Sequence, residues 1–404
     1  MSFNLKMVLR SGNVKKKASV ILSFVLIFFV ICLSSCNKSV YSEEVLLYTA
    51  EDLLKIEAED NRCFKLMNDI DCQGKTFTGI EKFNGIFDGN GYKISNINIT
   101  SNNNCYGFFS SANRVAQIKN LAIVDFNIDI NKTSSNEELF AGGLVGYFTA
   151  IREDGVIGGI SQCYIEGDIN LNVASKNNYI GGVAGCRTGG TFSDVFCATN
   201  IYNRCEYGMN QQRYLGGLFG INSGEVSHCI YAGSITDVGA NDGIFNTLKF
   251  AKTTIGGLVG LSSGNYTSYS SCVITPLYVG SQCADSNLYI SPIVGAYENY
   301  CNPSVTECYY TVYYYSDIVY WQKITSTSYG YDMSRKIGNS RLTLWTSDFL
   351  MGNPENIPGA MYHHYTEHGE EIPIKLDFSE EIWYFTTNLI EDESPDYPMP
   401  KIFK

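Results

Sequence analysis

Hydrophobic and polar residues alternate with a period of two over much of the region between residues 100 and 310. The segments QCYIEGDI (162–169) and VSHCIYAGSI (226–235) are examples; both are rich in β-branched and aromatic residues. No hydrophobic stripe with helical spacing and useful length appears in this region. The pattern therefore predicts several short β-strands and argues against a helical repeat protein.

A five-residue glycine motif recurs along the same region. Intact copies of the form Gly-Gly-x-x-Gly start at residues 142, 181, 216 and 256, so they lie 39, 35 and 40 residues apart. Degraded copies occupy Tyr106–Ser110 and Ser291–Gly295. A period of this length is typical of solenoids, propellers and arrays. The motif glycines are Gly142, Gly143, Gly146, Gly181, Gly182, Gly185, Gly216, Gly217, Gly220, Gly256, Gly257 and Gly260.

The glycines favour a β-solenoid over a propeller. In a solenoid, tight corners recur in register, and glycine suits them because it adopts a positive φ or admits a close backbone. We expect the glycines to be architectural, and we expect two turns of about 18–20 residues in each repeat. Six such repeats would stack to roughly 60 Å. The predicted fold class is all-β, a right-handed parallel β-helix (β-solenoid) with an N-terminal helical cap and an irregular C-terminal cap.

One cysteine follows each intact glycine motif and the degraded fifth copy. These residues are Cys163, Cys197, Cys229, Cys272 and Cys308. Because they recur at a similar phase of the repeat, we expect a ladder of reduced, buried thiols that serve as small hydrophobic side chains. The alternative for an exported chain is a disulfide network. Two turns per repeat would separate equivalent cysteines by about 9.6 Å, which is too far for a disulfide.

The two ends of the repeat region differ in sequence from its middle. Residues 50–56 predict a helix with Thr49 as its N-cap, and Asp88-Gly89-Asn90-Gly91 predicts a turn between two strands. We assign residues 49–100 to an N-terminal cap and first coil, and residues 101–315 to the repeats. Residues 316–404 change in composition and are assigned to a C-terminal cap or appended unit.

The N-terminus resembles a secretion signal. Lys15, Lys16 and Lys17 precede an apolar run from Ala18 to Ile31, which ends in Leu33-Ser34-Ser35-Cys36. The run is short for a membrane span, and its end resembles a bacterial lipobox. We therefore predict a signal peptide at 1–35, lipidation of Cys36, a linker at 36–48, and a membrane partner reached through the lipid. The predicted location is the cell envelope, at the outer membrane or cell surface.

The glycine repeats are similar to the GLUG motif, and FNGIFDGNGY (83–92) resembles the N-terminal coil that accompanies it. The resemblance spans roughly residues 49–310. It implies a right-handed parallel β-helix on a bacterial surface or secreted protein. It implies no chemistry, because a fold does not determine a function.

Charge and candidate motifs restrict the function further. The chain has 29 Lys and Arg against 41 Asp and Glu; without the five basic residues of 1–35 its net charge becomes −17, which argues against nucleic-acid partners. His364-Tyr365-Thr366-Glu367-His368 spells H-x-x-E-H, but flanking glycines and prolines predict a polar loop. The aspartates near 69–71 and 88–90 lack the spacing of a calcium loop. We expect no cofactor, no metal site and no catalytic set.

A tyrosine-rich stretch at 309–321 is the last notable feature. Tyr313, Tyr315 and Trp321 are candidate binding residues, since an exposed aromatic strip suits sugar stacking or a protein contact. The preferred interpretation is an aromatic plug at the end of the core. The predicted function is a lipid-anchored, non-catalytic binding or adhesion scaffold for a glycan or protein. The alternative is a polysaccharide-active enzyme, a lyase or glycosidase, on the same scaffold.

Overall fold

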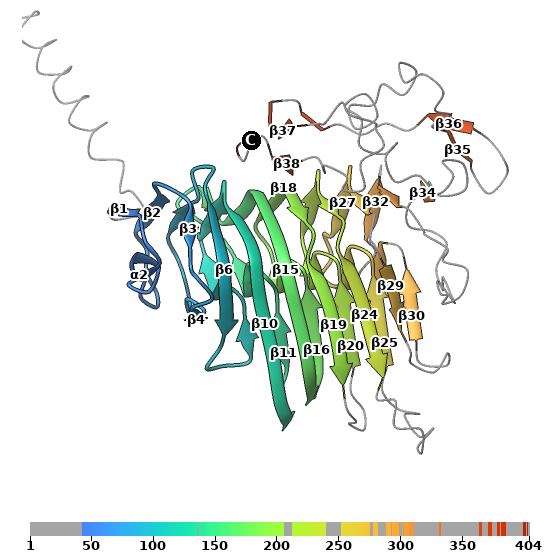
Figure 1. Ribbon diagram of the computed structural model, residues 1–404. Helices are drawn as coiled ribbons and strands as arrows, with labels where there is room; N and C mark the ends of the chain where they lie inside the picture. The colour runs from blue at the N-terminus through green and yellow to red at the C-terminus, as the bar shows by residue number, and fades with distance from the viewer. Residues whose placement is uncertain are drawn as a thin grey trace, which may run out of the picture. The chain divides into compact units, whose positions relative to one another are not determined.

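The computed structural model describes residues 43–135, 137–205, 212–239 and 252–274, with short stretches at 278–281, 288–291, 293–298, 301, 303–306, 308–310, 331–332, 363–365, 371–373, 378–379, 381–384, 399–400 and 402. These residues belong to the unit Glu43–Lys404. Their regular secondary structure is almost entirely β-strand, in mainly parallel sheets, with one four-residue helix (Figure 1). The all-β prediction is confirmed.

Three parallel sheets, here named A, B and C, contain most of the described strands. Sheet C consists of β7 (Cys105–Tyr106), β11 (Leu139–Ala141), β16 (Asn177–Gly181), β20 (Gln212–Gly216), β25 (Lys252–Gly256) and β30 (Leu288–Ser291). Sheet B consists of β8 (Phe109–Arg114), β12 (Val145–Ala150), β17 (Ala184–Thr188), β21 (Phe219–Ser223), β26 (Val259–Ser262) and β31 (Val294–Tyr297).

Sheet A is the largest and takes one or more strands from each repeat. Its strands are β1 (Glu44–Leu47), β2 (Cys63–Leu66), β3 (Ile70–Asp71), β4 (Thr76–Thr78), β5 (Ile86–Asp88), β6 (Lys93–Thr100), β9 (Gln117–Lys119), β10 (Ala122–Ser135), β15 (Gly159–Ser175), β18 (Thr191–Cys197), β19 (Asn200–Cys205), β22 (Glu225–Ser227), β23 (Ile230–Tyr231), β24 (Ser234–Gly239), β27 (Ser268–Ser270), β28 (Val273–Ile274), β29 (Tyr278–Ser281), β32 (Ser304–Thr306), β33 (Tyr309–Tyr310) and β34 (Tyr331–Asp332).

Three small antiparallel pairs lie outside these sheets. They are β13 (Arg152–Glu153) with β14 (Val156–Ile157), β35 (His363–Tyr365) with β36 (Glu371–Pro373), and β37 (Trp383–Tyr384) with β38 (Met399–Pro400).

Each repeat adds a single layer to the stack, so the prediction of two turns per repeat is wrong. Gly181 on β16 pairs directly with Gly216 on β20, and Gly216 pairs with Gly256 on β25. The reason is that each repeat is divided among three sheets, which uses all of its 35–40 residues in one layer. Equivalent residues are therefore about 4.8 Å apart, and six repeats stack to about 30 Å.

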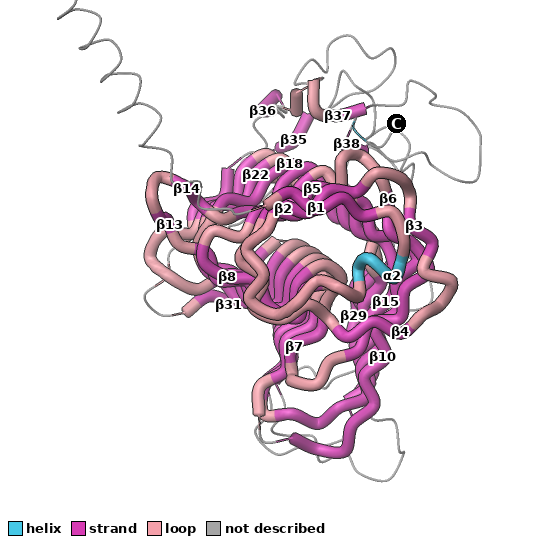
Figure 2. The backbone as a smooth tube through the Cα atoms, turned by 90° about the vertical axis from the view of Figure 1, so that its left-hand side faces the viewer, coloured by secondary structure: helices cyan, strands magenta, loops and turns pink. Residues whose placement is uncertain are grey.

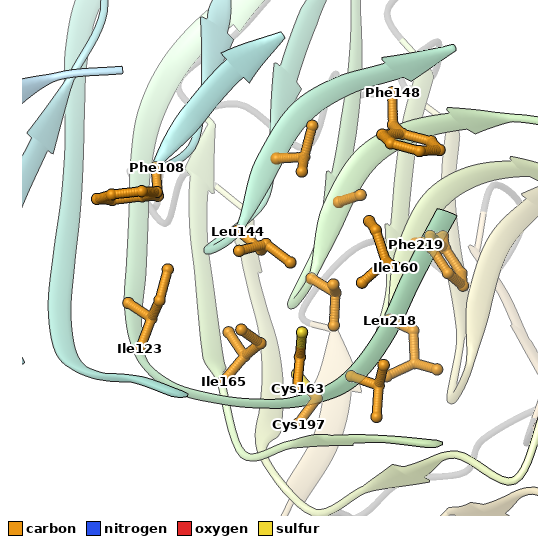
Figure 3. Close-up of a cluster of buried hydrophobic side chains, with 14 of the residues drawn as sticks. Phe108, Ile123, Leu144, Phe148, Ile160, Cys163, Ile165, Cys197, Leu218 and Phe219 are labelled. Carbon is orange, nitrogen blue, oxygen red and sulfur yellow. The ribbon is translucent and has the colours of Figure 1, made fainter. Parts of the chain in front are cut away.

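The inner faces of the three sheets bury one hydrophobic core. Figure 2 looks down the stack, with equivalent strands of successive layers behind one another, and Figure 3 shows side chains from different sheets pointing toward one another. Ile165 of sheet A, Leu218 between sheets C and B, and Phe219 of sheet B are all fully buried. The core forms because each strand alternates apolar inward and polar outward positions.

The glycine motif joins a strand of sheet C to a strand of sheet B, and close approach explains its three glycines. A Cβ on Gly185, the third glycine, would lie 2.5 Å from the Ala141 nitrogen and 2.7 Å from the Gly146 oxygen. A Cβ on Gly143, a second glycine, would instead meet the Phe126 ring from sheet A. No described motif glycine has a positive φ. The sequence left two explanations for the glycines, a positive φ or a close backbone contact. The structure shows the close contact.

A left-handed residue bends sheet A at the same place in successive layers. Five residues have φ between 50° and 58°, one in each of five successive layers: Asn120, Gln162, Asp194, His228 and Ser271. Each lies in or directly after a strand of sheet A, at the position equivalent to the end of β9. Such a kink lets inward side chains resume on the next strand segment. These bends recur because each layer repeats the pairing of the last.

The predicted N-terminal helix is present but short. Helix α2 (Ala50–Leu53) has a capping box in which Thr49 and Asp52 each accept the other's backbone N–H. It ends at Leu53, which is buried, and not at Ile56. The predicted turn is confirmed: Asn90 (φ 53°) and Gly91 (φ 83°) lie between β5 and β6.

Part of the C-terminal region lies along the side of sheet A. The Trp383 indole donates a hydrogen bond to the Asp194 carboxylate at 3.2 Å, and Phe378 packs against His228. Strand β38 contacts β15 and β18. We name residues 378–402 the C-terminal strap, of which 378–379, 381–384, 399–400 and 402 are described. Trp383 and Phe378 are both buried there.

Candidate binding surface

The outer face of sheet A carries in-register rows of polar side chains on the strands β6, β10, β15, β19 and β24, which lie side by side in Figure 1. We name it the Asx face. Alternate residues such as Ile128, Ile169 and Ile201 are buried, so their neighbours point outward. The face consists of Asn98, Asn127, Asp129, Asn131, Asp168, Asn170, Asn172, Asn200, Tyr202, Arg204, Ser234 and Thr236.

Hydrogen bonds between layers order these side chains. Asn127 donates to Asn98 at 3.5 Å, and Asn170 donates to Asn127 at 3.4 Å. Asn200 donates to the Asp168 carboxylate at 3.0 Å. A primary amide has two donor hydrogens and an acceptor oxygen with two lone pairs, so each amide keeps hydrogen-bonding capacity for a ligand.

The charges on the Asx face are mainly acidic. Asp129 and Asp168 are exposed on neighbouring strands. They are diagonal neighbours, because Asp129 pairs with Asn170, two residues beyond Asp168. The Arg204 guanidinium lies 4.8 Å from the centre of the Tyr202 ring and donates to the Tyr202 hydroxyl at 3.1 Å. The face therefore offers amides, carboxylates and hydroxyls, with its cation held against an aromatic ring.

A buried polar cluster supports the inner side of the same strands. Asn203 donates to the Asp237 carboxylate at 2.7 Å, and Arg213 of sheet C approaches the same oxygen at 3.3 Å. All three side chains are buried. A buried, hydrogen-bonded ion pair is weak evidence for added stability, but it fixes the register of the strands that carry Tyr202 and Thr236.

A second surface, the aromatic corner, lies where the outer faces of sheets B and C meet. The rings of Phe140, Tyr179 and Tyr214 stack at centroid distances of 5.1 and 5.2 Å, and Tyr147 packs edge-on against Phe140 at 5.0 Å. Burial raises the pKa of Tyr179. The middle ring has both faces covered by its neighbours, so this ladder is poorly suited to sugar stacking.

Another cation is buried in the core. Arg187 on β17 donates to the Asn222 amide oxygen and to the Gly190 carbonyl oxygen, both at 2.7 Å. Its guanidinium also lies 5.5 and 5.7 Å from the ring centres of Phe192 and Phe219. Burial lowers the pKa of Arg187 to about 10. Neutral oxygens and aromatic rings therefore solvate this charge inside the protein.

The five predicted cysteines are buried and have free thiols. They do not form one column: Cys163 lies opposite Val195, whereas Cys197 lies opposite Ile165. Cys197 occupies the next inward position, where its sulfur leaves no room for a side chain on Gly182: a Cβ there would lie 2.5 Å from the sulfur. The ladder is thus Cys163, Val195, Cys229, Cys272 and Cys308.

The single-layer repeat also changes the spacing of these thiols. Strand spacing places the Cα atom of Cys272 about 4.8 Å from those of Cys229 and Cys308, which lie in the layers on either side. This distance no longer argues against a disulfide. Each thiol donates to a carbonyl oxygen two residues earlier, at 3.0 Å for Cys229 and 3.3 Å for Cys272. Burial raises the pKa of Cys163 to about 12 and of Cys197 to about 11, which keeps these thiols protonated.

Most of the other predicted site residues lie in parts of the chain that the structure does not describe. Cys36, Tyr313, Tyr315 and Trp321 lie outside the described residues. His364 lies in the strand β35, paired with β36, and not in the polar loop expected from sequence. A zinc site of the H-x-x-E-H type needs a helix there.

The sequence analysis missed the Asx face, although a signal for it exists. The runs NIDIN (127–131), DINLN (168–172) and NIYNR (200–204) place polar residues at alternate positions, at the same phase of successive repeats. Alternation with buried isoleucines marks those positions as outward-facing.

No family model, curated protein or solved structure matches this chain. Within the described residues, no group of three or more His, Cys, Asp or Glu side chains is arranged to hold a metal ion. None of the helices in that part of the chain is long and apolar enough to cross a membrane.

Proposed function

We propose that this chain is a lipid-anchored protein of the bacterial cell envelope, at the outer membrane or cell surface, that works as a non-catalytic binding or adhesion scaffold. Its three sheets would form a right-handed parallel β-helix of the GLUG-repeat type. Helix α2 would cap its first layer, and residues 316–404 would supply a C-terminal cap. The layer-by-layer pairing of the sheets and the lipobox-like sequence before Cys36 support this proposal.

The Asx face carries the binding part of the proposal. Its polar side chains repeat in register over five strands and are ordered by contacts such as Asn127 to Asn98. A surface ordered before binding loses little conformational entropy when a ligand attaches. A repeating surface also offers many weak contacts at once, which suits adhesion.

Two measurements on the full-length chain test the proposal. Labelled palmitate supplied to expressing bacteria should enter the wild type and be absent from Cys36→Ala; label in that variant would contradict the anchor. Envelope fragments carrying the wild type should bind members of a glycan and host-protein array. Fragments without the protein are the control, and equal binding by both would contradict the scaffold function.

The second candidate function is a polysaccharide-active enzyme, and the Asp129–Asp168 pair favours it. Strand spacing places their Cα atoms about 8 Å apart. Paired carboxylates of inverting glycosidases have comparable separations. New reducing ends released from polysaccharide by the wild type, but not by Asp129→Asn/Asp168→Asn, would establish this alternative.

A further inference from the structure

We propose that the Asx face binds an extended, uncharged polysaccharide that lies across the strands, along the stacking direction. This inference rests on the proposed binding function and names its ligand class and site. The observations that carry it are the register, the hydrogen-bonding chemistry and the charge of the face.

The register suits a linear polymer. Asn98, Asn127 and Asp168 occupy equivalent positions on successive strands, and Asp168 is followed by Asn200 and Ser234. Successive polar groups are about 4.8 Å apart across the strands. A sugar unit in an extended chain has a similar length, so successive units would meet similar groups. A compact ligand would use only one or two layers of this array.

The side-chain chemistry matches sugar hydroxyls. A hydroxyl both donates and accepts hydrogen bonds, and so does the Asn amide. The bonds that Asn127 and Asn170 make to their neighbours measure 3.4–3.5 Å and leave other donor and acceptor positions open. Tyr202 is half-buried and adds an aromatic ring beside the rows, with Arg204 against it. Aromatic rings commonly pack against the apolar side of a sugar.

Charge and polarity separate this ligand from the other classes. The exposed carboxylates of Asp129 and Asp168 disfavour nucleic acids and acidic polysaccharides. Protein interfaces are usually enriched in aromatic residues at their core. Tyr202 is the one aromatic side chain among the residues that define the Asx face. An uncharged glycan is therefore the class that the face fits best.

The test is sedimentation of the full-length protein with three insoluble neutral polysaccharides: cellulose, β-1,3-glucan and starch granules. Asn127→Ala/Asn170→Ala removes two half-buried, outward-facing amides without replacing a core side chain. The matched control is Thr149→Ala/Thr188→Ala, which removes an inter-layer hydroxyl pair, 3.2 Å apart, from the outer face of sheet B. The unfolding midpoint of each variant establishes that it is folded.

We expect the wild type to bind at least one of the three polymers and the amide variant to bind it at least tenfold more weakly. The control should stay within twofold of the wild type. Failure of the wild type to bind any of them would overturn the inference. Equal binding by the amide variant would also overturn it, while leaving the proposed scaffold function standing, because the ligand would then occupy another surface.

Neutralising the two carboxylates of the Asx face gives a second, independent test. Asp129→Asn/Asp168→Asn should bind polygalacturonate more tightly than the wild type does, because the two carboxylates that repel an acidic polymer are removed. Unchanged exclusion of polygalacturonate would show that these carboxylates do not set the ligand charge, which would contradict the placement of the ligand on this face.

Discussion

Replacement of Gly185 by alanine tests the close packing at the corner between sheets B and C. The new Cβ would lie 2.5 Å from the Ala141 nitrogen, 2.7 Å from the Gly146 oxygen and 2.8 Å from the Phe140 carbonyl carbon. All three are backbone atoms, so no rotamer change relieves the overlap. Overpacking of this kind costs about 1–3 kcal/mol, and we expect the upper end here.

An opposing effect makes the sign of the result informative. Alanine restricts the unfolded chain more than glycine does, which stabilises a protein by about 0.4–1 kcal/mol where the native backbone tolerates it. Gly185 does not have a positive φ, so its backbone conformation is not one reserved for glycine. The expected net loss is therefore about 2 kcal/mol, measured by urea unfolding followed by far-UV circular dichroism. A variant as stable as the wild type, or more stable, would refute the close approach.

Gly143→Ala is the matched comparison, because its clash is mainly with a side chain. The added Cβ would lie 2.5 Å from an edge carbon of the Phe126 ring but 3.0 Å from the nearest backbone oxygen, that of Gly182. Combining it with Phe126→Leu should recover part of the lost stability. The same substitution of Phe126 should not rescue Gly185→Ala, since that corner is closed by backbone.

The remaining predictions concern the thiols, the strap and the helix. Cys229→Ala should lower the free energy of unfolding by about 1 kcal/mol and Cys229→Asp by far more, and its thiol should react with a thiol reagent only after denaturation. Trp383→Phe should cost about 1–3 kcal/mol, because the buried Asp194 carboxylate loses its donor; an unchanged unfolding midpoint would argue against the contact. The pKa of Asp52 is lowered to about 2, chiefly by Lys55, so its stabilising effect should be complete above about pH 4 and lost as pH falls toward 2. Asp52→Asn should remove that acid-dependent component from a pH series of unfolding curves.

The sequence predicted those parts of the fold that depend on local pattern. Alternation in 162–169 and 226–235 correctly predicted strands, and the Asp-Gly-Asn-Gly turn formed because its residues tolerate left-handed conformations. The recurrence of glycine pairs correctly marked a repeated structural unit. These features are fixed by residues close together in sequence.

The parts that failed depend on how many residues one layer uses. A 35–40-residue period fits either two short turns or one long one, and only the pairing of Gly181 with Gly216 decides between them. A second ambiguity misplaced Cys197, since two inward positions of one strand are equivalent in an alternating pattern. The Asx face could not be predicted without knowing that pairing, because it brings together residues from separate repeats.

The C-terminal strap contacts two distant layers of the stack. Phe378 is anchored beside His228, and Gly91 leaves no room for a Cβ beside the Ile402 carbonyl oxygen. The strap thus links one of the later layers to one of the earliest with a fixed number of residues. Duplication of one repeat between them would move the anchors apart by about 4.8 Å. The strap therefore joins layers that no single repeat connects, and gain or loss of an internal repeat would change the distance between its two contacts.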